Sequence, residues 1–108
     1  MKLTGKCKED FEMFIFRQKG TLPKGIESYN YYDLQESYII SDIVNWFDSV
    51  EIYIIINIEN YFYYEIESEY FTFRKRGFGY NSRLAANKSA IIKVNEIYNN
   101  KNLIKQSP

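Results

Sequence analysis

The stretch VEIYIIINIENYFYYEIESEYFTFR, residues 50–74, decides the fold because apolar side chains recur at every second position along it. A period of two is typical of β-strands that bury one side. The stretch predicts strands at 50–58, 61–67 and 70–74, separated by turns at Glu59-Asn60 and Ser68-Glu69. Strands joined by such short turns pair antiparallel, and so we expect a three-stranded meander.

Alternation along these strands places their side chains on two sides of the predicted sheet. The apolar side carries Val50, Ile52, Ile54, Ile56, Ile58, Phe62, Tyr64 and Ile66. The other side carries Tyr53, Ile55, Asn57, Tyr61, Tyr63, Glu65, Tyr70 and Thr72. This second side is either solvated or a docking surface. Its tyrosines favour docking, because tyrosine combines a large contact area with a polar tip.

Helical periodicity flanks the strand region on both sides. The sequence predicts helices over about 4–18, 33–48 and 82–99, with Thr4, Asp33 and either Asn81 or Ser82 as N-terminal caps. Ala86 and Ala90 permit a close approach of the last helix to the sheet. The order helix, helix, three strands, helix predicts one α+β domain over residues 1–100, with helices on one face of an antiparallel sheet. Residues 101–108 are predicted to form a flexible tail.

Charge is segregated along the chain although the formal net charge is zero. Residues 31–72 carry nine anions and no cation, whereas residues 73–108 carry eight cations and one anion. Such blocks either form opposed surface patches that steer charged partners or neutralise each other within the fold. Aromatic residues reach 19% of the chain, which reflects either codon usage in an AT-rich genome or selection for a binding surface.

The sequence contains few of the histidine and cysteine side chains that enzymes commonly use for catalysis. The chain has no histidine and one cysteine, Cys7, which falls on the apolar stripe of the first predicted helix. Zinc, Ser-His and Cys-His sites are therefore excluded, and we expect no metal site, no cofactor and no enzyme activity. Gly77-Phe78-Gly79 lacks the further glycine of a dinucleotide site and is predicted to be a turn. A lone cysteine, with no signal sequence and no long apolar run, predicts a cytoplasmic protein without a membrane span.

A basic turn followed by an alanine-rich helix resembles the end of a double-stranded-RNA-binding domain, over residues 50–98. Ser82, Arg83, Ala86 and Ala90 stand where that pattern has them, whereas Leu84 and Asn87 replace cations of the family. The resemblance implies phosphate contacts across an RNA groove. The residues for this RNA-binding alternative are Arg74, Lys75, Arg76, Arg83 and Lys88.

The segments LTGKCKEDFE (3–12), LP (22–23), FDSV (47–50) and AIIKVNEIYN (90–99) resemble small uncharacterised proteins of phages and mobile elements. That resemblance covers the whole chain. Proteins of this kind include anti-CRISPR inhibitors, which bind an RNA-guided nuclease directly. It therefore implies a non-enzymatic, protein-binding inhibitor of a host defence nuclease.

In this leading hypothesis an acidic surface meets a basic channel and aromatic side chains act as anchors. The predicted contact residues are Phe16, Tyr53, Tyr61, Tyr63, Glu65, Glu67, Glu69, Tyr70 and Ile92. Phe16 and Ile92 depart from the pattern of these proteins and are expected to add exposed apolar surface. A third hypothesis is a homodimeric structural protein that associates through the tyrosine-rich sheet face.

Overall fold

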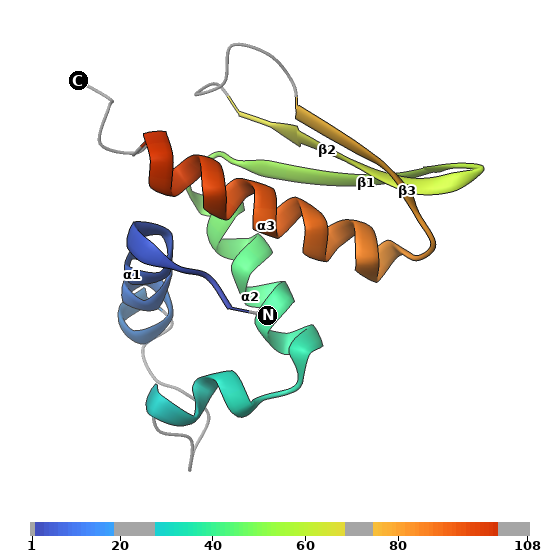
Figure 1. The fold of residues 1–108 in the computed structure, drawn as a ribbon. Coiled ribbons are helices and arrows are strands. Elements are labelled where there is room, and N and C mark those ends of the chain that lie inside the picture. The colour runs from blue at the N-terminus through green and yellow to red at the C-terminus, as the bar shows by residue number, and fades with distance from the viewer. Residues whose placement is uncertain (1, 19–27, 69–74, 102–108) are drawn as a thin grey trace.

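The computed structural model describes residues 2–18, 28–68 and 75–101 and confirms the predicted α+β fold. Its helices are α1 (Gly5–Met13), α2 (Glu36–Ser49) and α3 (Arg83–Lys101), and its strands are β1 (Tyr53–Glu59), β2 (Tyr61–Glu67) and β3 (Lys75–Tyr80). Figure 1 shows α3 running along one face of the sheet, with α1 packed against α3 and α2 leading into β1. None of the described helices is long and apolar enough to cross a membrane.

The sheet is an antiparallel meander in the order β1-β2-β3. Ile54 pairs with Ile66, and Ile56 pairs with Tyr64, on the side that packs against α3. Ala86 and Ala90 of α3 are fully buried, as expected of a helix that approaches a sheet closely. Asn60 forms the apex between β1 and β2 with φ +66°, a conformation that asparagine tolerates better than most residues.

The third predicted strand, 70–74, falls outside the described residues, and the strand described next to it is β3, Lys75–Tyr80. β3 includes the Gly77–Gly79 segment that was predicted to be a turn. That prediction was wrong because both glycines lie within the strand. Gly77 pairs with Tyr64, whose ring occupies the space above it, and the register shifts by a bulge between Phe62 and Tyr64.

The first two predicted helices differ in detail from the structure. After α1 the chain continues as a π-helix over Phe14–Gln18. The second helix, predicted over 33–48, begins only at Glu36 as α2, because Gln35 adopts an extended conformation with ψ +139°, and a 3₁₀-helix, Ser28–Asp33, precedes it. Asp33 therefore does not cap α2. Glu51 has φ +64°, which delays the start of β1 to Tyr53.

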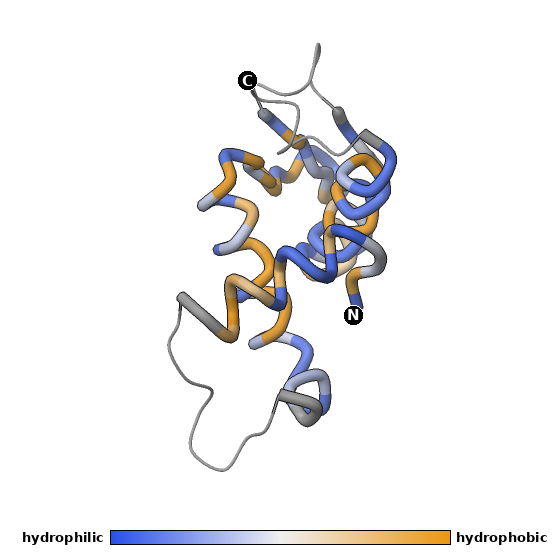
Figure 2. Tube along the Cα trace, turned by 90° about the vertical axis from the view of Figure 1, so that its left-hand side faces the viewer, coloured by the Kyte–Doolittle hydropathy of each residue, from blue (hydrophilic) through white to orange (hydrophobic). Residues whose placement is uncertain are grey.

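The core lies between α3, α2, α1 and the inner side of the sheet. Its largest fully buried side chains include Phe11, Phe47, Ile43, Ile66 and Tyr98. In Figure 2 hydrophobic and hydrophilic residues alternate along the chain trace, as expected of elements that bury one side. Burial of these apolar side chains is the main favourable contribution to folding.

Two asparagines of α3 hold the N-terminus of α1, where Thr4 makes no side-chain capping hydrogen bond. The backbone N–H of Cys7 donates to Asn99 Oδ1 at 2.8 Å, and Asn99 Nδ2 donates to the Thr4 carbonyl at 2.9 Å. Asn95 accepts from the Thr4 N–H and donates to Thr4 Oγ1, both at 2.9 Å. The helix is thus capped by a segment more than 90 residues away in sequence.

Tyrosine hydroxyls join the helical segments to one another. Tyr98 of α3 donates to Asp10 of α1, Tyr32 donates to Glu12 at 2.8 Å, and Tyr31 donates to Asp42 at 2.6 Å. Burial, followed by these hydrogen bonds to carboxylates, raises the pKa of Tyr31, Tyr32 and Tyr98. These hydrogen bonds offset the free-energy cost of burying the tyrosine hydroxyls without a partner.

Cys7 is fully buried, as predicted, and burial followed by the nearby Asp10 charge raises its pKa from 9.0 to about 12. We expect the native thiol to react with a thiol reagent at pH 8 roughly 1,000-fold more slowly than in the unfolded chain, because the thiolate fraction falls by about that factor. Since the pKa is raised on folding, the neutral thiol stabilises the fold below pH 9, and this contribution is lost as the pH rises toward 12. Labelling rates in buffer and in denaturant check this, and equal rates would contradict it.

Candidate protein-binding face

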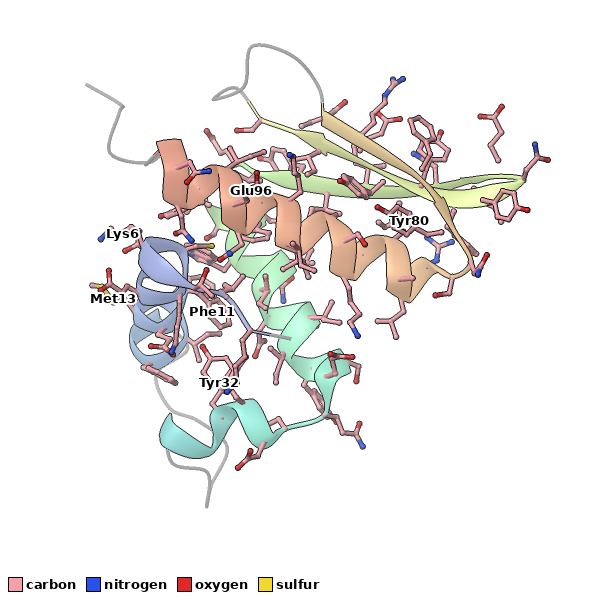
Figure 3. All side chains as sticks on the ribbon, viewed as in Figure 1. Lys6, Phe11, Met13, Tyr32, Tyr80 and Glu96 are labelled. Atoms are coloured by element: carbon pink, nitrogen blue, oxygen red, sulfur yellow. The ribbon has the colours of Figure 1, made fainter. Side chains whose placement is uncertain are left out.

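The sheet face directed away from α3 carries no helix among the described residues (Figure 1). We call it the open face. Its described members are Tyr53, Ile55, Asn57, Glu59, Tyr61, Tyr63, Glu65, Glu67, Arg76 and Phe78. Figure 3 shows side chains projecting from the strands on this side, whereas Tyr80 lies on the side of α3. No described helix therefore covers the side chains on this face.

Aromatic side chains gather near the end of the open face that adjoins the β1-β2 turn. Tyr63 and Phe78 stack with ring centroids 5.1 Å apart and an interplanar angle of 25°. Phe78 is 64% exposed and Tyr61 is 58% exposed. Tyr53, at the other end of β1, is also exposed. Large rings held in place by a sheet lose little conformational freedom when a partner binds them, which suits them to act as anchors.

A polar pair interrupts this aromatic surface. Glu65 pairs with Arg76 across β2 and β3, with Oε2 3.8 Å from Nη2. Glu65 is only 9% exposed, so the expectation of an exposed anion at this position was wrong. Glu67 is half-buried on the same face, and Glu59, beside Tyr61, is the exposed anion of the surface.

The other predicted contact residues fall in different places. Ile92 is 58% exposed on α3, as expected. Phe16 is half-buried and its ring packs edge-on against Tyr31, 6.2 Å between centroids, so it adds less exposed surface than expected. Glu69 and Tyr70 lie outside the described residues. The open face thus unites Tyr53, Tyr61 and Tyr63, but not Phe16 or Ile92.

The cations of the RNA-binding alternative are dispersed. Lys88 Nζ lies 2.9 Å from Glu36 Oε1, and this bond lowers the pKa of Glu36. Arg76 is on the open face with Glu65, while the guanidinium of Arg83 lies 5.5 Å from the ring centroid of Phe62. Arg74 and the side chain of Lys75 are outside the described residues. The Glu36–Lys88 and Glu65–Arg76 pairs join the acidic block to the basic block within the fold.

Sequence reasoning missed Phe78, the most exposed large hydrophobic residue described. Its position between two glycines indicated a turn, and only the bulged pairing of β3 brings its ring onto Tyr63. An exposed aromatic residue between glycines was the available signal. Among the described residues, no group of three or more His, Cys, Asp or Glu side chains is arranged to hold a metal ion.

Comparison with protein-family models, curated proteins and solved structures finds no match. The two resemblances noted in the sequence therefore stay predictions.

Proposed function

We propose that this protein is a non-enzymatic protein-binding module that docks through its open face and inhibits a host defence nuclease by direct binding. The observation that carries the proposal is a sheet face that no described helix covers, on which Tyr61 and Phe78 are exposed and Phe78 stacks on the half-buried Tyr63. Interface anchors are enriched in aromatic side chains, whose removal from the centre of a contact costs most of the binding energy. The nuclease as target is what the resemblance to mobile-element proteins implies.

The charge of the open face suits a basic partner surface. Glu59 is exposed next to Tyr61 at the tip of the β1-β2 hairpin, and Glu67 is half-buried at the other end of β2. Arg76 is engaged with Glu65 and adds no free cation at the centre of the face. Anions around aromatic anchors favour a partner rich in lysine and arginine, such as a nucleic-acid channel.

The test measures binding with one anchor removed. The protein is immobilised, partners are captured from host extract with and without RNase, and the captured nuclease is purified and titrated. We expect Tyr61→Ala to weaken binding by at least about tenfold, whereas Tyr38→Ala, with a similarly exposed tyrosine on α2, changes it less than about twofold. Inhibition of nuclease activity should follow the same order.

Two outcomes would contradict this proposal. Equal binding by Tyr61→Ala and wild type would show that the open face is not the contact. Capture that disappears after RNase treatment would favour the RNA-binding alternative, which the order of three strands followed by the Ser82-capped α3 supports. In that case affinity should fall steeply with salt, because phosphate contacts release counterions.

A further inference from the structure

The two edges of the sheet differ in how they are protected against pairing with another chain. β3, at one edge, contains Lys75, Arg76, two glycines and a bulge, all of which discourage the addition of a further strand. β1, at the other edge, reads YIIINIE and has no cation, proline, glycine or bulge. Natural sheets usually protect long apolar edge strands against pairing with other chains, and the sequence of β1 has none of the protective features found in β3.

The backbone groups on the outer edge of β1 have no partner among the described residues. Within the described part of the chain β1 bonds only to β2, through a regular register from Tyr53↔Glu67 to Glu59↔Tyr61. The backbone hydrogen bonds described outside helices and strands include none to residues 53–59. Alternate N–H and C=O groups along the seven-residue strand therefore point outward and are available to a further strand.

The isoleucines of β1 are incompletely buried. Ile54, Ile55 and Ile56 are half-buried, and Ile58 is 62% exposed, although Ile54, Ile56 and Ile58 all lie on the α3 side. On the central strand, by contrast, Tyr64 and Ile66 are buried. A strand added beside β1 would cover the flanks of these isoleucines and remove apolar surface from water.

We propose that the edge of β1 pairs with β1 of a second copy of this chain, antiparallel about a two-fold axis at Ile56, to form a continuous six-stranded sheet. In this register Ile56 faces Ile56 of the second copy, and Ile54 faces its Ile58. Ile55 faces Asn57, and Tyr53 faces Glu59. All seven residues of the strand then have a partner.

The sequence of β1 suits pairing with itself better than pairing with an unrelated strand. Every position on the α3 side is isoleucine, so the two-fold register matches isoleucine with isoleucine at each of these positions. Glu59, the one charged residue of β1, meets Tyr53 and not its own copy. The interface is isologous, and it extends the open face across both copies without using it as the contact.

Sedimentation equilibrium over a wide concentration range tests this proposal with the complete chain. We expect the wild type to form a dimer, and Ile58→Lys to raise the dimer dissociation constant at least about tenfold, because symmetry changes two Ile54–Ile58 contacts at once. Ile92→Lys is the matched control, since Ile92 is 58% exposed on α3, and it should dimerise like the wild type. Circular dichroism establishes that both variants remain folded.

Hydrogen exchange supplies a readout that does not depend on a variant. Protection of alternate β1 amides should increase with protein concentration, whereas protection of β3 amides should not. The proposal is overturned by a wild-type protein that is monomeric throughout, or by Ile58→Lys and Ile92→Lys associating alike. It is also overturned by a dimer that Phe78→Ala dissociates and Ile58→Lys does not, because that dimer would use the open face.

Discussion

Replacing Phe11 with alanine is expected to lower the free energy of unfolding by about 3–5 kcal/mol. Phe11 is fully buried in α1, and its ring centroid lies 5.8 Å from that of Trp46 in α2 and 6.1 Å from that of Tyr31 in the 3₁₀-helix. Three segments therefore meet at one ring. Truncation removes its contacts with all of them and leaves a cavity that rigid neighbouring rings cannot fill.

Met13→Ala is the control for this experiment, because Met13 is in the same helix but is 46% exposed. Figure 3 shows Met13 on the outer side of α1 and Phe11 on the inner side. The control should cost about 0.5 kcal/mol or less. Both values come from denaturant titration followed by circular dichroism. A loss below about 1 kcal/mol for Phe11→Ala would show that α1 contributes little to the cooperative core.

The strands and their two sides could be predicted because alternation is a local property of the sequence. Isoleucine at positions 52, 54, 56 and 58 predicts that one side of the strand faces the core, whatever packs against it. The Ser82 cap was equally local, and Ser82 Oγ accepts from the Ala85 N–H at 3.0 Å. The side of the sheet that faces the core and the side that forms the open face could thus be predicted without knowledge of any tertiary contact.

Tertiary contacts decide the features that could not be predicted. Thr4 is a good capping residue by type, yet Asn99 of α3 occupies the capping position at Cys7 instead. Glu65 is an acidic residue on an alternating strand, and so the sequence predicts that it is exposed. In the structure it forms an ion pair with Arg76 of β3, and the register between β2 and β3 that brings the two together could not be predicted. Part of the candidate site could therefore be predicted. The positions of its tyrosines follow from strand alternation, whereas the positions of Phe78 and of the Glu65–Arg76 pair depend on where β3 pairs with β2.

Gly77→Ala is expected to lower the free energy of unfolding by about 2–3 kcal/mol through steric conflict. A Cβ atom at this position would lie 2.3 Å from Cε2 and 2.5 Å from Cζ of Tyr64. The Tyr64 ring is only 6% exposed and stacks on Tyr80 with centroids 5.9 Å apart. Moving that ring therefore disturbs the inner side of the sheet, and the cost cannot be relieved by rotating one side chain into solvent.

Gly79→Ala separates this steric effect from backbone strain. Gly79 has φ +89°, and a Cβ there would meet no atom within 4 Å, so its substitution should cost about 1 kcal/mol from conformation alone. The decisive measurement is a double-mutant cycle by denaturant titration. In a Tyr64→Ala background, Gly77→Ala should cost less than about 0.5 kcal/mol, because the obstructing ring is gone. If Gly77→Ala costs the same in both backgrounds, steric conflict with the Tyr64 ring is not the cause of the loss.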